Sequence, residues 1–203
     1  MAYSSEALLV RPRIGSTELG LVNRVTPAEA QWKDLEVELR RLGHGQRWTV
    51  DTGEREAVIV LLGGIATVTS NRGEWQRVGR RPDVFSGMPW ALYLPRRSQV
   101  ELVSQSERLE FACALAPSDR DHQARLVTPA EVAIELRGGG SNSRQINGIV
   151  PPGFDCHRLV AVEVYTPSGN WSSYPPHKHD VDNPPIEADL DEIYYFRFAA
   201  PDG

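Results

Sequence analysis

The amino-acid sequence predicts an all-β protein, built as a sandwich or barrel of short strands. The 203 residues include 17 glycines and 15 prolines, which interrupt the chain every few residues. The segments between them are short and rich in β-branched and aromatic residues, which favour strands. Many short strands at regular spacing are typical of sandwiches and barrels.

The predicted strands follow one another through the first half of the chain. Residues 57–62 (AVIVLL) have the continuous hydrophobicity of a buried strand, which Gly63 and Gly64 end. A turn is expected at residues 71–73 (NRG). The other strands expected in this half are residues 65–69, 75–78, 90–94, 99–103 and 109–115.

Residues 32–42 (WKDLEVELRRL) fit two periodicities. Leu35, Leu39 and Leu42 recur at helical spacing, whereas Leu35, Val37 and Leu39 alternate with charged residues as in a strand. The β-rich neighbourhood and the glycines at positions 43 and 45 favour a strand.

Charge and composition exclude several classes of partner. The net charge of −5 argues against nucleic acid and anionic membranes, because both require a basic face. No apolar run approaches the roughly 20 residues of a membrane helix, and the first ten residues do not resemble a signal peptide. Cys113 and Cys156 make no disulfide framework. We therefore expect a cytoplasmic protein, for which a small anionic ligand remains compatible.

Residues 138–143 (GGGSNS) are the most flexible stretch and predict a linker or mobile loop between two halves, 1–137 and 138–203. No Lys or helix signal follows the triple glycine, so a spacer is favoured over a phosphate-binding loop. A strong strand is expected at residues 159–165 (LVAVEVY).

A candidate metal site follows that strand. His177 and His179 are two residues apart on an extended segment, which places both imidazoles on one face. Imidazole nitrogens are common metal ligands. Pro175 and Pro176 stiffen the approach to the pair.

A carboxylate is expected from the next predicted strand, residues 192–196 (EIYYF). Glu192 is in register with it. Glu187 and Asp189 lie in the preceding loop, where carboxylates are more often solvated, and Asp191 would point to the opposite face.

Residues 169–180 (GNWSSYPPHKHD), followed by residues 191–195 (DEIYY), resemble the signature of the 5-deoxy-glucuronate isomerases of inositol breakdown. These are cupins related to the 5-keto-4-deoxyuronate isomerases. Residues 144–149 (RQINGI) and 159–166 (LVAVEVYT) also fit the family pattern. The resemblance extends over nearly the whole chain.

The resemblance implies a bicupin, with two double-stranded β-helix barrels in tandem and the metal in the second. It implies that His177, His179 and Glu192 are ligands of a divalent metal (Zn first, or Mn, Fe, Co or Ni), and that a fourth His comes from a later strand. Residues 1–137 are then a barrel without a metal site, with Glu56 at the usual acidic position and only His44 nearby. Residues 138–203 are the linker and the first part of a truncated metal-binding barrel.

The implied reaction is metal-dependent aldose–ketose isomerisation of 5-deoxy-D-glucuronate to 5-dehydro-2-deoxy-D-gluconate, with the metal as Lewis acid. Lys178, Tyr174 and Tyr195 are candidates for moving the proton, and the sequence selects none of them. A metal-bound hydroxide, or a hydride shift without a protein base, is equally compatible.

Arg144 is the first candidate for the substrate carboxylate, because a guanidinium binds it bidentately. Lys178 is the second, although alternation places it opposite the histidines. Trp171 and Tyr174 are candidates for packing on the sugar ring or for the barrel wall. Two alternatives stay open, a different cupin metalloenzyme such as an iron dioxygenase, and a non-catalytic sugar-acid-binding cupin. Exposed strand edges are also compatible with a homo-oligomer.

Overall fold

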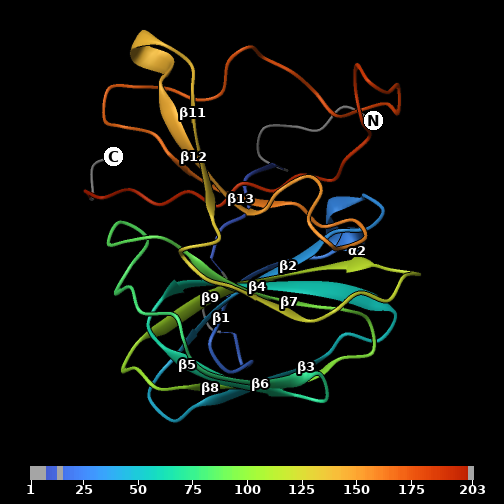
Figure 1. Cartoon of the computed structure of the whole chain (residues 1–203), viewed down its shortest axis with the longest axis vertical. Helices are drawn as coiled ribbons and strands as arrows, with labels where there is room; N and C mark the ends of the chain where they lie inside the picture. Colours follow the sequence, from blue (N-terminus) through green and yellow to red (C-terminus); the bar gives the residue numbers. More distant parts are fainter. Residues whose placement is uncertain (1–7, 13–15, 201–203) are drawn as a thin grey trace.

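A computed structural model describes residues 8–12 and 16–200, and within these ranges the chain is almost entirely β (Figure 1). The all-β prediction is confirmed. Every strand pairing in the three sheets is antiparallel. No helix in the described ranges has the length and hydrophobicity that crossing a bilayer requires.

Three sheets make up the molecule. The first sheet contains, in spatial order, β1 (Leu21–Val25), β2 (Glu36–Leu42), β9 (Leu109–Pro117), β4 (Arg55–Gly63), β7 (Trp90–Leu94) and β10 (Arg125–Val127). The second contains β3 (Arg47–Asp51), β8 (Gln99–Ser104), β5 (Ala66–Ser70) and β6 (Gly73–Val78). The third contains β11 (Ala133–Arg137), β12 (Arg144–Val150) and β13 (Ala161–Tyr165).

The first two sheets pack face to face, and we call them the sandwich. Ile59 of β4 lies in the core between these sheets, with Leu92, Leu102 and Phe111. The preceding side chain of β4, Val58, points to the opposite face and belongs to a second core. Both faces of β4 are therefore covered, which explains its continuous hydrophobic sequence.

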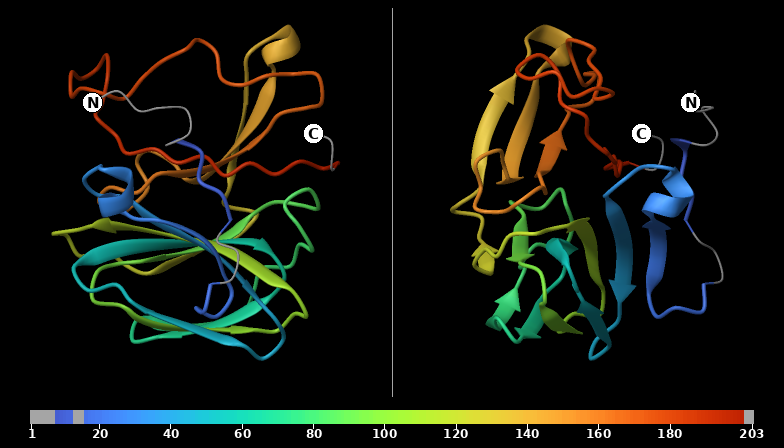
Figure 2. Two further views of the ribbon diagram at one scale, coloured as in Figure 1. Left: turned by 180° about the vertical axis from the view of Figure 1, so that it is seen from behind. Right: turned by 90° about the vertical axis from the view of Figure 1, so that its right-hand side faces the viewer.

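The second core joins the sandwich to the rest of the chain. It brings Val58 and Tyr93 of the first sheet together with Val150 and Leu159. The third sheet consequently lies beyond the outer face of the six-stranded sheet (Figures 1 and 2). Residues 138–143 connect β11 to β12, with a 3-10 turn at Gly140–Asn142.

Residues 166–200 contain no named strand, and Asn183 and Glu187 form an isolated bridge. The prediction of a strand at residues 192–196 is therefore wrong. The segment is extended and its side chains alternate, but no neighbouring strand pairs with its main chain, and a strand exists only with a partner. In Figure 1 the last residues of this segment are red and cross between the third sheet and the sandwich.

The segment 32–42 is a strand only from Glu36 onward, as β2. Ahead of it, Pro27–Ala30 forms a helical turn, α2, which the sequence prediction missed. Thr26 caps this turn: its hydroxyl accepts from the Glu29 amide at 3.3 Å, and the Glu29 carboxylate accepts from the Thr26 amide at 3.2 Å.

Candidate functional site

The segment that carries the two histidines is fixed at its start by β12 and the turn before it. After β13 the chain folds back, and the Asn170 side chain donates to the Ser143 carbonyl at 2.8 Å. Arg144 Nη2 lies 3.5 Å from the carbonyl oxygen of Tyr174, three residues before His177. The first residues of β12 therefore hold the approach to the histidine pair.

His177 and His179 lie side by side, with ring centroids 5.3 Å apart and ring planes at 90°. His177 Nδ1 lies 3.0 Å from the Pro175 carbonyl oxygen, and His179 Nδ1 lies 3.1 Å from that of Ala188. Because a carbonyl oxygen only accepts, these contacts favour a proton on each Nδ1, and in the neutral imidazole the lone pair is then on Nε2. This is the tautomer that binds a metal through Nε2, with a carbonyl as the supporting partner.

Glu187, the first of the four candidate carboxylates, has hydrogen-bond partners within its own loop. It accepts from the main-chain amides of Asp180 and Val181 at 2.7 and 3.0 Å. The hydrogen bond from the Asp180 amide is the largest cause that lowers the pKa of Glu187, and Lys178 adds to it. The side chain is an anchor for the loop.

The next two carboxylates bind the sandwich side of the molecule. Asp189 pairs with Lys33 at 2.6 Å. Asp191 accepts from the main-chain amides of Asp34 and Leu35 at 2.7 and 3.0 Å. Each therefore has a structural partner already.

Glu192 accepts a hydrogen bond from the Tyr194 hydroxyl at 2.8 Å. Burial, and then this contact, raise the pKa of Tyr194 to about 12, so its hydroxyl stays a donor at neutral pH. Within the described contacts, Glu192 is the least committed of the four carboxylates.

The described residues bring the two histidines together but leave Glu192 apart, and they form no group of three side chains able to hold a metal ion. The donor types suit a divalent metal, since both Nε2 atoms are free to coordinate. The geometry supplies two nitrogen donors and a separate carboxylate, not a joined site.

Arg144 is a buried cation, with 7% of its surface exposed. Its Nη1 donates to the Asn142 carbonyl at 3.2 Å, and its Nε has no partner. No carboxylate forms an ion pair with it among the described residues. Glu135 acts on it only at longer range: the pKa of Glu135 is lowered first by its hydrogen bond with Arg137 and, to a smaller extent, by the charge of Arg144. A buried guanidinium without a direct ion pair is costly, so this environment favours an anionic ligand.

The comparisons with known proteins decide the family. The sequence pattern of the KduI/IolB family matches residues 8–203. The chain belongs to the KduI/IolB family. This confirms the resemblance predicted from residues 169–180.

Two curated relatives in this family share the same name. The chain is 40% identical over 190 residues to a 5-deoxy-glucuronate isomerase of Geobacillus kaustophilus, covering 93% of this chain and 68% of that protein. It is 42% identical over 179 residues to the 5-deoxy-glucuronate isomerase of Geobacillus thermodenitrificans, covering 88% of this chain and 65% of that protein.

A solved structure of an IolB-like protein from Salmonella typhimurium LT2 has the same fold, with a TM-score of 0.81 at 32% identity. The match covers 85% of this chain and 66% of that one. The chain thus spans about two thirds of the length of these KduI/IolB relatives.

The candidates for moving the proton lie in different surroundings. Lys178 pairs with Asp180 at 3.1 Å and lies 3.3 Å from Glu187. These contacts, the Asp180 hydrogen bond first, raise the pKa of Lys178, which disfavours it as a proton acceptor. The Tyr195 hydroxyl donates to Glu110 of the sandwich at 3.2 Å.

Tyr174 is exposed and meets the exposed Trp171 edge to face, with ring centroids 5.7 Å apart. This aromatic pair lies beside Arg144, through the contact of Arg144 with the Tyr174 carbonyl. Trp171 and Tyr174 are thus surface groups next to a buried cation, a placement that suits a sugar ring.

Sequence reasoning missed Glu110, a buried carboxylate in β9 that accepts from Tyr195 and Arg197. The available signal was a single acidic residue between Leu109 and Phe111 in an otherwise apolar strand. A charge at such a position has to be paired when the strand is buried.

Proposed function

We propose that this chain belongs to a metal-dependent aldose–ketose isomerase that converts 5-deoxy-D-glucuronate to 5-dehydro-2-deoxy-D-gluconate in myo-inositol catabolism. The names of the Geobacillus relatives support the substrate and the reaction class. The proposed ligand is a small sugar acid, and the proposed location is the cytoplasm.

The main observation behind this proposal is the environment of Arg144. This residue is buried, forms no direct ion pair among the described residues, and bonds the carbonyl of Tyr174 at the start of the histidine segment. A carboxylate is the anion that a guanidinium binds bidentately. We therefore assign Arg144 to the carboxylate of the sugar acid, with Trp171 and Tyr174 beside the sugar.

His177 and His179 are the proposed nitrogen ligands of a divalent metal, with Zn the first expectation and Mn, Fe, Co or Ni as alternatives. Glu192 is the proposed carboxylate ligand, because the three neighbouring carboxylates have structural partners. We further propose two units, residues 1–137, which carry no metal site, and residues 138–203, which carry the ligands.

A non-catalytic sugar-acid-binding module is the second candidate. The observation in its favour is the separation of Glu192 from the histidine pair in the described structure. Such a module would use Arg144 and the aromatic pair in the same way but would not need a metal.

The test is metal content and Co²⁺ binding of the purified chain, together with a coupled isomerase assay. The isomerase proposal predicts about one bound ion per chain, and at least about tenfold weaker binding in His177→Ala and His179→Ala. His44→Ala is the control, because His44 is exposed in the turn after β2. Less than about one tenth of an ion per chain, with sugar-acid binding retained, would favour the binding module.

A further inference from the structure

Strand β11 is an outer edge of the third sheet, and no described strand pairs with its free side. All five of its residues are exposed, and Ile134 and Leu136 leave 59% and 79% of their surfaces in solvent. The pairing with β12 on the other side is regular over these five residues and contains no bulge. A regular edge that exposes apolar side chains is a template for a further strand.

The other sheet edges are less suited to adding a strand. The pairings of β1, β6 and β13 with their neighbours contain register shifts, and β10 has only three residues. Edge strand β3 is regular, but its apolar side chains Trp48 and Val50 pack with the sandwich core. Pairing at β3 would therefore hide little further apolar surface, whereas pairing at β11 covers side chains that are now in solvent.

Glu135 and Arg137 are the charged residues of β11. They pair with each other along the strand at 2.7 Å, and their side chains are 57% and 53% exposed. Among the described contacts, neither forms an ion pair with a residue of another strand. Their charges are therefore available to a strand that pairs with the free side of β11.

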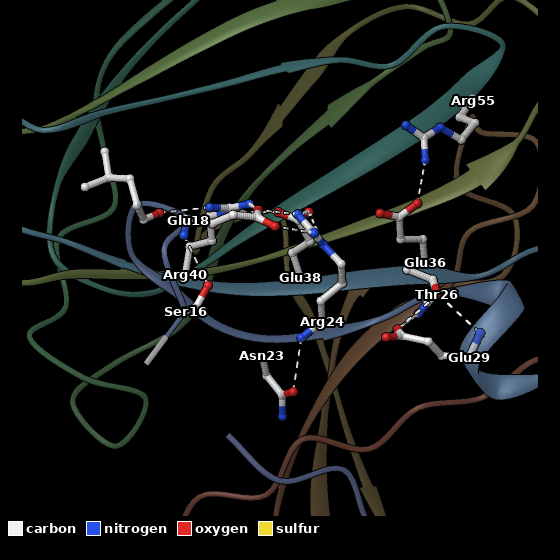
Figure 3. A network of polar contacts seen from close by, with 11 residues as sticks. Ser16, Glu18, Asn23, Arg24, Thr26, Glu29, Glu36, Glu38, Arg40 and Arg55 are labelled. Atoms are coloured by element: carbon white, nitrogen blue, oxygen red, sulfur yellow. Dashed lines mark hydrogen bonds and ion pairs between the residues drawn. The ribbon is translucent and has the colours of Figure 1, made fainter. Parts of the chain in front are cut away.

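This chain shows elsewhere how an arginine and a glutamate pair across two antiparallel strands. Arg24 of β1 lies directly opposite Glu38 of β2, and its Nε donates to the Glu38 carboxylate at 2.8 Å (Figure 3). Opposite charges in directly opposed positions stabilise a strand pair, and like charges destabilise it. The charges of β11 therefore select the register of an added strand.

We propose that β11 is an interface between two copies of this chain, which pair antiparallel about a two-fold axis at Leu136. In this register Glu135 of each copy faces Arg137 of the other, and the two Leu136 side chains lie opposite each other. Ile134 is then a diagonal neighbour of Leu136 of the second copy. A register centred on Glu135 would instead place two carboxylates opposite each other.

The orientation of the hairpin is compatible with this pairing. Strands β11 and β12 project from the sandwich, and the turn between them lies at the far end (Figure 1). Because the two hairpins would run in opposite directions, the two sandwiches would lie at opposite ends of the joined sheet. The interface is a single strand pair, so we expect a weak dimer, at the low end of protein interfaces. This inference is independent of the proposed function.

The test is sedimentation equilibrium of the purified chain from about 10 µM to about 1 mM, with charge reversals in β11. Wild type should show a monomer–dimer equilibrium. Glu135→Arg alone and Arg137→Glu alone each place like charges opposite each other at both ends of the two-fold pair. Each should weaken self-association at least about fivefold. The double variant, Glu135→Arg with Arg137→Glu, should restore it.

An equimolar mixture of the two single variants isolates the contact between chains. Each variant has two like charges within its own β11, but in a mixed dimer the arginines of one chain face the glutamates of the other. Association should therefore recover in the mixture, which a change in the stability of either chain cannot produce. Arg47→Glu is the matched control, because Arg47 is exposed and pairs with Glu101 within the sandwich, and it should not change association.

Three outcomes would overturn the proposal. A chain that stays monomeric throughout the concentration range does not pair with itself, and the edge is then free for another protein. A dimer whose affinity is unchanged in both single variants uses a different surface. Association that is lost in both single variants and does not recover in their mixture shows that Glu135 and Arg137 do not face each other across a two-fold axis.

Discussion

The Glu56 carboxylate accepts a hydrogen bond from the main-chain amide of Leu159 at 2.9 Å, across a sequence separation of 103 residues. It also accepts from the amides of His157 and Arg158 at 2.8 and 2.6 Å, and from the Tyr93 hydroxyl at 2.9 Å. One buried side chain of the sandwich therefore satisfies three consecutive amides ahead of β13. Glu56 occupies the acidic position expected from the resemblance to a cupin strand pair. In this structure it is a clamp that fixes residues 157–159 to the sandwich.

Glu56→Ala is expected to lower the free energy of unfolding by about 3 kcal/mol or more, because it leaves several buried donors without an acceptor. Urea unfolding followed by tryptophan fluorescence measures this. Glu54→Gln is the control, since Glu54 is itself exposed where it pairs with Arg96 and Arg97, and its urea midpoint should match wild type. A Glu56→Ala stability within about 0.5 kcal/mol of wild type would contradict the clamp.

The strands of the sandwich could be predicted because their signals are local. Residues 90–94 were predicted as a strand and form β7 with the same bounds, and residues 57–62 lie within β4. The sequence does not predict β10 or β11. Strand β10 has only three residues, too few to show a period although Val127 is buried, and all five residues of β11 are exposed. Residues 192–196 have a strand pattern but no partner strand, and pairing is not encoded locally.

In the candidate site, too, local patterns could be predicted from the sequence and long-range contacts could not. Alternation predicted that Asp191 points away from Glu192, and the structure uses the Asp191 carboxylate to bind the amides of Asp34 and Leu35. The roles of Glu56 and Glu110 could not be predicted, because their partners lie far along the chain. The role of a buried carboxylate depends on its long-range partners, which cannot be read from a single sequence.

Cys156 is expected to react slowly with thiol reagents. Burial first, and then Glu56, raise the pKa of its thiol to about 11, from the ordinary 9.0. The neutral thiol also donates to the Leu159 carbonyl at 3.2 Å. Because the thiolate is the nucleophile, iodoacetamide labelling at pH 8 should be roughly 100-fold slower than for a free cysteine.

The labelling rate should rise about tenfold per pH unit until about pH 11, since each unit adds thiolate in that proportion. Cys113 is fully buried with a raised pKa and should label only on unfolding. Mass spectrometry of labelled peptides separates the two residues, and urea-unfolded chain is the control in which both react. Rapid Cys156 labelling at pH 8 in the folded protein would show that this thiol is not held as described.

Arg144→Gln is expected to raise the KM for the sugar acid by about 10-fold to 100-fold, the range for a lost charge-assisted hydrogen bond. The KM of Arg144→Lys should lie between those of wild type and Arg144→Gln, because lysine keeps the charge but lacks the planar guanidinium. Arg137→Gln is the control: Arg137 lies directly opposite Arg144 in the β11–β12 register but is exposed and paired with Glu135.

The unfolding free energy separates a binding role of Arg144 from a structural one. Removing a buried cation that forms no direct ion pair relieves its desolvation cost, which offsets the loss of its hydrogen bonds to the Asn142 and Tyr174 carbonyls. Arg144→Gln should therefore unfold at the wild-type urea concentration or above it while binding weakens. A loss of stability with unchanged KM would assign Arg144 to the fold instead.

Lys178→Gln is expected to keep kcat within about threefold of wild type, well short of the 10²-fold or greater loss typical of a missing general base. The Asp180 and Glu187 contacts hold Lys178 protonated, because they raise its pKa, and a protonated amine accepts no proton. The loop should stay in place, since Glu187 keeps both main-chain hydrogen bonds in the variant. The measurement is kcat against pH for Lys178→Gln and wild type, with His177→Ala as the inactive reference. A loss of 100-fold or more, together with the disappearance of one limb of the pH profile, would make Lys178 the proton-transfer residue and would require the Asp180 pair to open during turnover.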